Sequence, residues 1–111
     1  RYVTEIRGGP KRKLYKFDVI GCAVNWLNEK DWAGDEATEI WVAERTSTRE
    51  KVNWLNAREA RYLGGAMSPM NYNYEAVNAS EPGSIDFVEL TTTILADAPN
   101  HICATPTENL K

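Results

Sequence analysis

The stretch from residue 14 to residue 28, LYKFDVIGCAVNWLN, decides the fold because a strand pattern gives way there to a helix pattern. The β-favouring side chains of Leu14–Phe17 predict a short strand. Asp18 is a residue type that caps helix N-termini, so we expect the helix to cover residues 19–28. The apolar side chains at helical spacing are Ile20, Ala23, Val24, Trp26 and Leu27. An apolar helix face directly after a strand predicts a helix packed on a sheet.

The chain before this stretch predicts a second strand and a tight turn. Residues 1–7 alternate in polarity, and the turn signal GGP at 8–10 joins them to the strand at 14–17 as a hairpin. Residues 1–16 carry six basic residues and one acidic residue, whereas the remaining residues sum to a net charge of −8. The basic cluster KRK at 11–13 has two interpretations, an anionic docking surface or a solvated hairpin tip.

After residue 28, short β-favouring segments alternate with turn residues. Residues 56–63 fit either a helix closed by the following glycines or an extended segment. Further strands are predicted over 38–44, 51–55, 71–77 and 85–87, and a second helix over 88–96. Three successive threonines lie inside that second helix and oppose it, because β-branched residues lose rotamer freedom there. Prolines at 99 and 106 indicate an extended tail, so we expect a domain over 1–97 and a tail over 98–111.

Composition bounds the class of protein. The 111 residues are 42% hydrophobic and 26% charged, which suits one domain with one core and excludes intrinsic disorder. Apolar runs are far shorter than the ~18 residues that a membrane span needs. The net charge of −3 is too small to predict a nucleic-acid partner.

The pentapeptide VNWLN occurs twice, at 24–28 and at 52–56. The first copy falls in the predicted helix and the second in a predicted strand. A duplicated unit and coincidence both explain the repeat, and the unlike flanking sequences favour coincidence. Tertiary context, not the five residues, then decides the structure of each copy.

Catalytic motifs are missing from the sequence. The single histidine is His101, and no Gly-x-Ser-x-Gly elbow, His-Glu-x-x-His helix or glycine-rich phosphate loop occurs. His101 and Cys103 form a Cys–His pair only formally, because a proline-flanked segment does not orient them. We therefore do not expect an enzyme.

Sulfur-bearing residues offer a different chemistry. Met67 and Met70 flank Ser68-Pro69, and thioethers are soft donors suited to copper(I). The alternative is that these methionines fill gaps in the core. Cys22 and Cys103 form one bridge in an exported protein or stay as free thiols in a reducing compartment.

Five segments spread over residues 14–87 share their order and spacing with a known family. They are YKFDVIGC at 15–22 with Trp26-Leu27, EIWV at 39–42, WLNAREA at 54–60 with Tyr62, SPMNY at 68–72 with Ala76, and SIDF at 84–87. Together they resemble the NosL family, the copper-carrying accessory proteins of nitrous oxide reductase maturation. The family patterns at these places are Phe-Asp-x-Ile-Gly-Cys, Trp-Val, Asp-Ala-Arg-x-Ala, Pro-Met-Gly-Tyr and Gly-x-x-x-Phe.

The resemblance implies an α+β fold of two β-β-α-β units that share one core and are related to the organomercurial lyase core. It also implies a strand rather than a helix within residues 56–63. The implied location is periplasmic or otherwise extracytoplasmic, with membrane attachment through an N-terminal lipid, as in a lipoprotein. The implied role is that of a metallochaperone, which binds copper(I) and delivers it to a protein partner.

Two residues carry over from the family directly. Met70 matches the Pro-Met position and is implied as a copper ligand, while Cys22 matches a recurrent cysteine implied to pack. The family's N-terminal Cys-x-Met element would precede Arg1, so the resemblance places the lipid anchor upstream of this sequence.

The chain departs from the family after Met70. Asn71 stands where the family has glycine, and Tyr72 stands where some members have a ligating histidine. We therefore expect further copper ligands from Met67, His101 and Cys103.

Two other functions stay open. A NosL-like domain that has lost metal binding would serve as an interaction module of a larger assembly, with Trp32, Trp41 and Tyr74 as contact residues. An enzyme related to the mercury lyases would need paired thiolates around an acid, for which Cys22 with Asp18 is a poor substitute.

Overall fold

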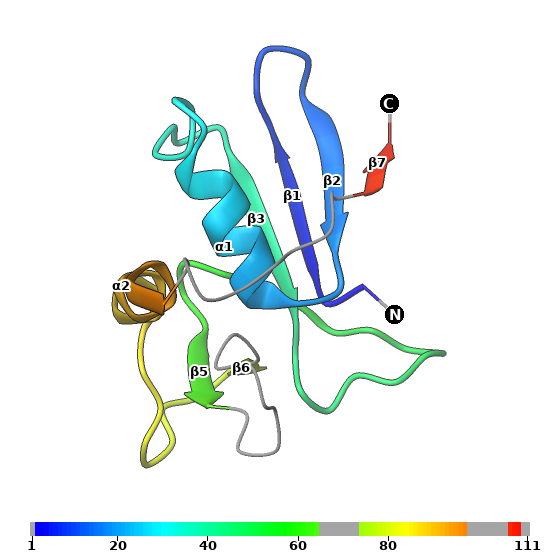
Figure 1. Cartoon of the computed structure of the whole chain (residues 1–111). Helices are drawn as coiled ribbons and strands as arrows, with labels where there is room; N and C mark the ends of the chain where they lie inside the picture. The colour runs from blue at the N-terminus through cyan, green and yellow to red at the C-terminus, as the bar shows by residue number, and fades with distance from the viewer. Residues whose placement is uncertain (1, 65–73, 98–106, 110–111) are drawn as a thin grey trace.

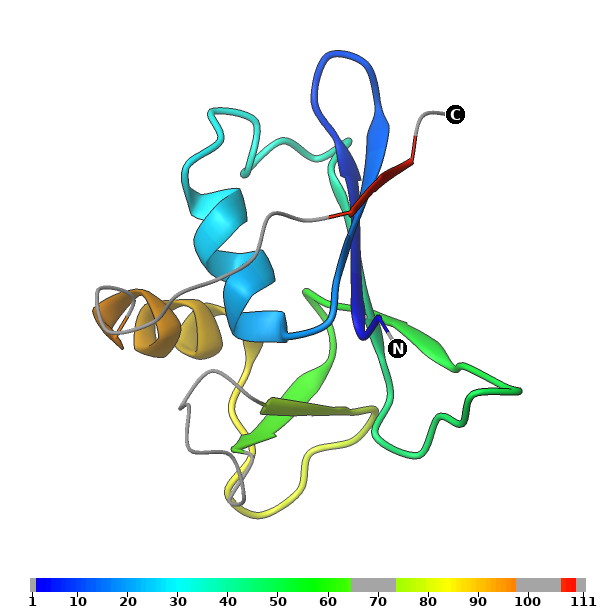
Figure 2. The ribbon, with the colours of Figure 1, turned by 45° about the vertical axis from the view of Figure 1, so that its right-hand side comes forward.

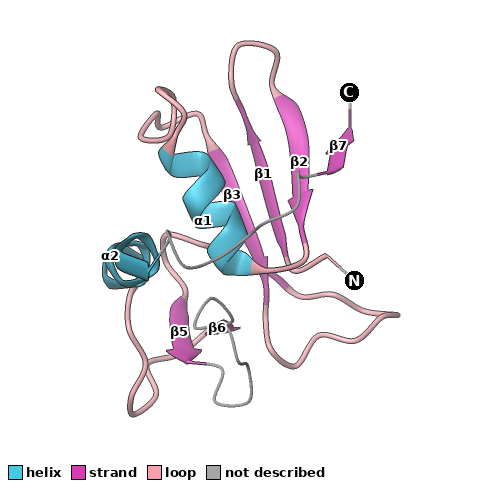
Figure 3. Ribbon diagram, viewed as in Figure 1, coloured by secondary structure: helices cyan, strands magenta, loops and turns pink. Residues whose placement is uncertain are grey.

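The computed structural model describes residues 2–64, 74–97 and 107–109, which form an α+β fold with two helices and two sheets (Figures 1 and 3). The elements are β1 Thr4–Gly8, β2 Lys13–Phe17, α1 Ile20–Asn28, β3 Glu39–Ala43, β4 Trp54–Asn56, β5 Arg61–Gly64, β6 Tyr74–Val77, α2 Phe87–Asp97 and β7 Thr107–Asn109. The predicted α+β class is confirmed at this level.

Five strands form the larger sheet in the order β4-β3-β1-β2-β7, and every neighbouring pair is antiparallel. Ile6 in the central strand stands opposite Tyr15 of β2 and Ile40 of β3. Thr4 and Ile6 are fully buried, whereas Glu5 and Arg7, which alternate with them along the strand, are partly exposed. This period of two means that one face of the sheet is buried, and α1 lies against that face (Figure 2).

Helix α1 begins one residue later than the sequence predicts. The N-cap position belongs to Val19, in extended conformation, and no side chain caps the helix there. The prediction that Asp18 is the N-cap is therefore wrong, because Asp18 precedes the cap position and remains exposed. The apolar face is as predicted, since Ile20, Val24 and Leu27 are buried against the sheet.

The smaller sheet pairs β5 with β6, and Figure 1 shows it below α2. Helix α2 packs on both α1 and β5, and its residues Leu90 and Ile94 are completely buried. The core is continuous, because buried residues from both sheets and both helices belong to one cluster.

Helix α2 confirms the predicted helix despite its threonines. The Asp86 carboxylate accepts the backbone N–H of Glu89, a hydrogen bond that satisfies a free amide at the helix start. The hydroxyls of Thr91 and Thr92 donate to the carbonyls of Phe87 and Val88, one turn back. The hydroxyl groups of Thr91 and Thr92 thus have hydrogen-bond partners inside the helix.

Several predicted strand boundaries are wrong. The strand expected over 51–55 is formed only by Trp54–Asn56, because the preceding residues turn back through Thr48 and Lys51. Residues 57–60 are a turn between β4 and β5, so only part of the expected 56–63 strand exists. Of residues 85–87, Ile85 makes an isolated bridge to Tyr62, while Phe87 begins α2.

The C-terminal segment contributes to the fold. Strand β7, part of the expected tail, pairs with β2 at the edge of the larger sheet. The antiparallel register places Leu14 opposite Asn109. Figures 1 and 2 show β7 beside β2, far from the smaller sheet.

Trp32 fixes the loop that follows α1. A Cβ atom at Gly8 would lie 2.7 Å from Trp32 Cζ3, so the indole packs directly on the glycine backbone at the end of β1. Thr38 Oγ1 donates a hydrogen bond to the Trp32 carbonyl at 2.8 Å. The predicted turn at 8–10 therefore also provides a packing surface that only glycine leaves open.

Candidate functional site

The predicted copper ligands lie in parts of the chain that the structure leaves undescribed. Met67 and Met70 fall in residues 65–73, and His101 and Cys103 fall in residues 98–106. No proximity among these four residues is therefore established. The structure does describe the anchors of both segments, which are the β5–β6 hairpin and the β2–β7 ladder.

The methionine-bearing segment connects two paired strands. Its two ends, Gly64 and Tyr74, are partners in the β5–β6 ladder. Tyr62, two residues before Gly64, is completely buried, and its hydroxyl donates to the Ala57 carbonyl at 2.6 Å. Burial raises the pKa of Tyr62 and keeps the phenol protonated as a donor. The strand that leads into the segment is thus anchored in the core at Tyr62, two residues before its exposed end at Gly64.

Cys22 lies on α1, half-buried, and packs against the core. Its sulfur is disulfide-bonded. The predicted pairing with Cys103, the other cysteine of the chain, stays a prediction. A disulfide sulfur is no thiolate, so Cys22 in this state offers no ligand for copper(I).

The described residues contain no cluster of metal-binding side chains. Within residues 2–64, 74–97 and 107–109, no three side chains of histidine, cysteine, aspartate or glutamate converge as a metal site would require. Glu44 illustrates how the described carboxylates are used, because it accepts hydrogen bonds from Asn53 and Thr46 at 2.9 Å each. These bonds lower the pKa of Glu44 below its usual value.

The basic cluster at 11–13 lies at the tip of the β1–β2 hairpin. Arg12 takes a left-handed backbone conformation there, with φ of 51°. Its guanidinium pairs with the Glu39 carboxylate at 2.8 Å and also donates to the Ala37 carbonyl. The charge of Arg12 is thereby neutralised internally, and the hairpin-tip interpretation accounts for the arrangement of this residue.

The three aromatic residues expected as contact residues have different environments. Trp32 stacks on Tyr15 and meets Trp26 edge-on, with ring centroids 6.5 Å and 5.9 Å apart. Tyr74 is half-buried against the core. Trp41 is half-buried in β3, and its indole N–H donates to Glu39 at 3.2 Å. Trp41 stands opposite Glu5 and therefore shares the sheet face away from α1.

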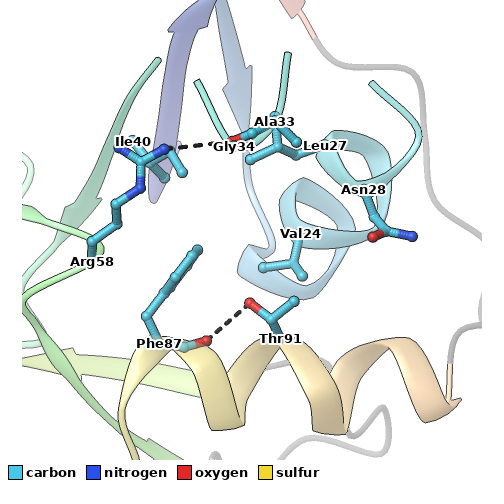
Figure 4. Close-up of a pocket in the computed structure, with 9 residues that line it drawn as sticks. All are labelled: Val24, Leu27, Asn28, Ala33, Gly34, Ile40, Arg58, Phe87 and Thr91. Carbon is cyan, nitrogen blue, oxygen red and sulfur yellow. Dashed lines mark hydrogen bonds between the residues drawn. The ribbon is translucent and has the colours of Figure 1, made fainter. Parts of the chain in front are cut away.

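An apolar cavity of about 220 Å³ lies between α1, α2 and the loop that carries Arg58 (Figure 4). Its lining comprises Val24, Leu27, Asn28, Ala33, Gly34, Ile40, Arg58, Phe87 and Thr91. Figure 4 shows the Phe87 ring pointing into the space between Arg58 and Val24, and the Asn28 amide pointing away. Sequence reasoning missed this cavity because its walls come from five separate segments, and periodicity within one segment does not reveal their meeting.

The Arg58 side chain is held in place by backbone carbonyls. Its guanidinium donates to the Thr38 carbonyl at 2.9 Å and to the Ala33 carbonyl at 3.5 Å. Its backbone N–H donates to the side chain of Asn56 at 3.0 Å, which fixes the turn. The one sequence signal for Arg58 was its position in the WLNAREA segment.

Comparisons with other proteins add no relative. No family model, no curated protein and no solved structure matches the chain. Neither of the two described helices is long and apolar enough to cross a membrane.

Proposed function

We propose that the chain is an extracytoplasmic, NosL-like copper(I)-binding protein that delivers the ion to a protein partner. Met70 and Met67 supply the thioether ligands, and His101 is the candidate for completing the site. Cys103 adds a thiolate only in a state of the protein in which it is not bonded to Cys22. Copper(I) suits such soft donors and accepts low coordination numbers, so the ion can pass to a partner by ligand exchange.

The observation that carries the proposal is the anchoring of the methionine-bearing segment. Residues 65–73 leave β5 at Gly64 and return to β6 at Tyr74, two residues that pair in the ladder. Tyr62 holds this ladder in the core through its buried ring and its bond to Ala57. A short segment closed at its base has fewer accessible conformations than a free tail, which lowers the entropic cost of ordering it around one ion.

Two further features support the family relation. The described elements run β1-β2-α1-β3 and later β5-β6-α2-β7, so the order strand, strand, helix, strand occurs twice. The disulfide bond of Cys22 suits an oxidising compartment outside the cytoplasm. A membrane-attached periplasmic protein would lie in such a compartment.

The test is a competition titration of copper(I) against a chromogenic copper(I) chelator, with the disulfide-intact protein. We expect Met70→Ala and Met70→Leu to weaken binding by roughly tenfold or more, because leucine restores the volume but not the thioether. Met67→Leu is the second variant, and Val88→Leu is the matched surface control, since Val88 is 74% exposed on α2. Equal affinities for wild type and both methionine variants would remove these residues from the site.

The second candidate function is an interaction module without metal. The specific observation is the sheet face away from α1, where Glu5, Arg7 and Trp41 are only half-buried. In Figure 2 no described helix covers that face. If the wild type and a variant with both Met67 and Met70 changed to leucine bind copper(I) with equal affinity, the interaction module becomes the proposed function in place of copper delivery.

A further inference from the structure

We propose that the cavity between α1 and α2 binds a small apolar carboxylate, with the hydrocarbon group inside and the carboxylate at Arg58. The ligand class is an aromatic or short aliphatic acid. This site is separate from the proposed copper site, because none of its lining residues is a proposed metal ligand.

The size of the cavity determines how large the hydrocarbon part of the ligand can be. An apolar protein cavity of about 150 Å³ accepts benzene, so about 220 Å³ accommodates one ring with a short substituent. Drug-sized ligands need pockets of roughly 300 Å³ or more. The walls suit such a ring, because Val24, Leu27 and Ile40 are each 6% exposed and present aliphatic surface opposite Phe87.

The charge of the lining residues determines which polar group the ligand carries. Arg58 carries the only formal charge among the nine lining residues, and no carboxylate is among them. The ion pairs found among the described residues, Arg12–Glu39 and Arg45–Glu81, leave Arg58 out. A cation at the mouth of an apolar cavity is complementary to an anion with an apolar body.

The hydrogen bonds of Arg58 make it a prearranged anion receptor. A guanidinium has five N–H donors, and the contacts to Thr38 and Ala33 use one donor on each terminal nitrogen. The remaining donors can meet a carboxylate, and the two carbonyl contacts already fix the orientation of the fork. The entropic cost of ordering a long side chain is thereby largely met before the ligand arrives.

The experiment is an NMR titration of the full chain with benzoate and, in parallel, with benzamide as its uncharged analogue. We expect benzoate to shift the amide signals of Val24, Leu27 and Phe87 and to bind roughly tenfold more tightly than benzamide, the difference that a charge-assisted hydrogen bond provides. Equal affinities, or shifts confined to other residues, would overturn the proposal.

Three variants separate the charge from the cavity. Arg58→Gln should reduce benzoate affinity roughly tenfold and leave benzamide within about twofold, whereas Arg45→Gln removes a charge outside the cavity and should change neither. Thr91→Leu fills the cavity and suits a helix, so it should abolish binding of both probes even if Arg58→Gln fails to fold. Retained benzoate binding in Thr91→Leu, or equal losses in both arginine variants, would reject the site.

Discussion

The two sheets of this molecule are held together in different ways. The five-stranded sheet has four ladders, and its central strand β1 is paired on both sides along most of its length. The two-stranded sheet has one ladder, and its Tyr62 is buried completely and exchanges two 2.8 Å backbone hydrogen bonds with Ile85. The larger sheet therefore spreads its pairing over four ladders, whereas Tyr62 is the largest fully buried side chain of the smaller one.

The two sheets meet at few points. The Arg45 backbone N–H donates to the Ala76 carbonyl at 2.9 Å, and Glu44 makes a bridge to Ala76. Helix α2 adds Leu90 and Ile94 to the common core. If the smaller sheet is the weaker part, substitutions there should open it locally before the whole chain unfolds.

The largest effect should come from Tyr62→Ala. Removing a buried aromatic ring leaves a cavity and costs about 3–5 kcal/mol of the free energy of unfolding. Tyr62→Phe keeps the ring, loses only the bond to Ala57 and should cost about 1 kcal/mol. Urea denaturation gives both values, and hydrogen exchange should show faster opening in β5 and β6 than in β1. A loss below about 1 kcal/mol for Tyr62→Ala would mean that the smaller sheet does not depend on Tyr62 more than the larger sheet depends on single residues.

Breaking the disulfide of Cys22 should have the next largest effect. A native disulfide contributes about 2–4 kcal/mol, and pairing with Cys103 would close a loop of roughly 80 residues. Thermal unfolding with and without a reductant measures the loss. Thiol counting in denaturant without a reductant identifies the pairing, and two free thiols in the purified chain would contradict it.

Gly8→Ala tests the packing between β1 and the loop after α1. The new methyl group would meet Trp32 Cζ3 at 2.7 Å, so the indole must shift, at a cost of about 1–3 kcal/mol. Gly34→Ala is the matched control, because its Cβ would have nothing within 4 Å and should change stability by less than about 1 kcal/mol. Equal effects of the two substitutions would show that Trp32 does not hold Gly8 closely.

The smallest effect concerns the pH dependence at Glu44, beside the junction of the sheets. Its folded pKa is lowered by the hydrogen bonds from Asn53 and Thr46, so its stabilising contribution exists above the unfolded pKa. That contribution is lost as the pH falls through the folded pKa. An NMR titration of the carboxyl carbon should show a low midpoint that rises in Asn53→Ala and stays unchanged in Asn28→Ala. An unchanged midpoint in Asn53→Ala would contradict the assignment.

The β1–β2 hairpin and α1 were predictable because their signals are local. Alternation and a glycine turn identified the β1–β2 hairpin, and apolar spacing identified α1 with its buried Leu27. The pentapeptide at 24–28 is helical, and the copy at 52–56 contributes its last three residues to β4, as its surroundings require. Local sequence patterns therefore predict the structure correctly where residues close in sequence also lie close in space.

The smaller sheet and the cavity were less predictable because their partners are distant in sequence. Tyr62 pairs with Ile85, and Arg58 reaches the carbonyls of Ala33 and Thr38. No periodicity in residues 56–63 indicates either contact. The copper ligands depend on the family resemblance and stay predictions, because Met70 and its companions lie outside the described residues.

The pairing of β2 with β7 has a consequence for synthesis of the protein. Strand β2 spans Lys13–Phe17, whereas its partner Thr107–Asn109 leaves the ribosome later than every other described strand. Until then, one edge of β2 presents unpaired backbone groups to other nascent chains, which is a known route to aggregation. Lys13 and Lys16 belong to β2 and Lys11 to the adjoining turn, and repulsion between these charges on two copies opposes their pairing during that interval.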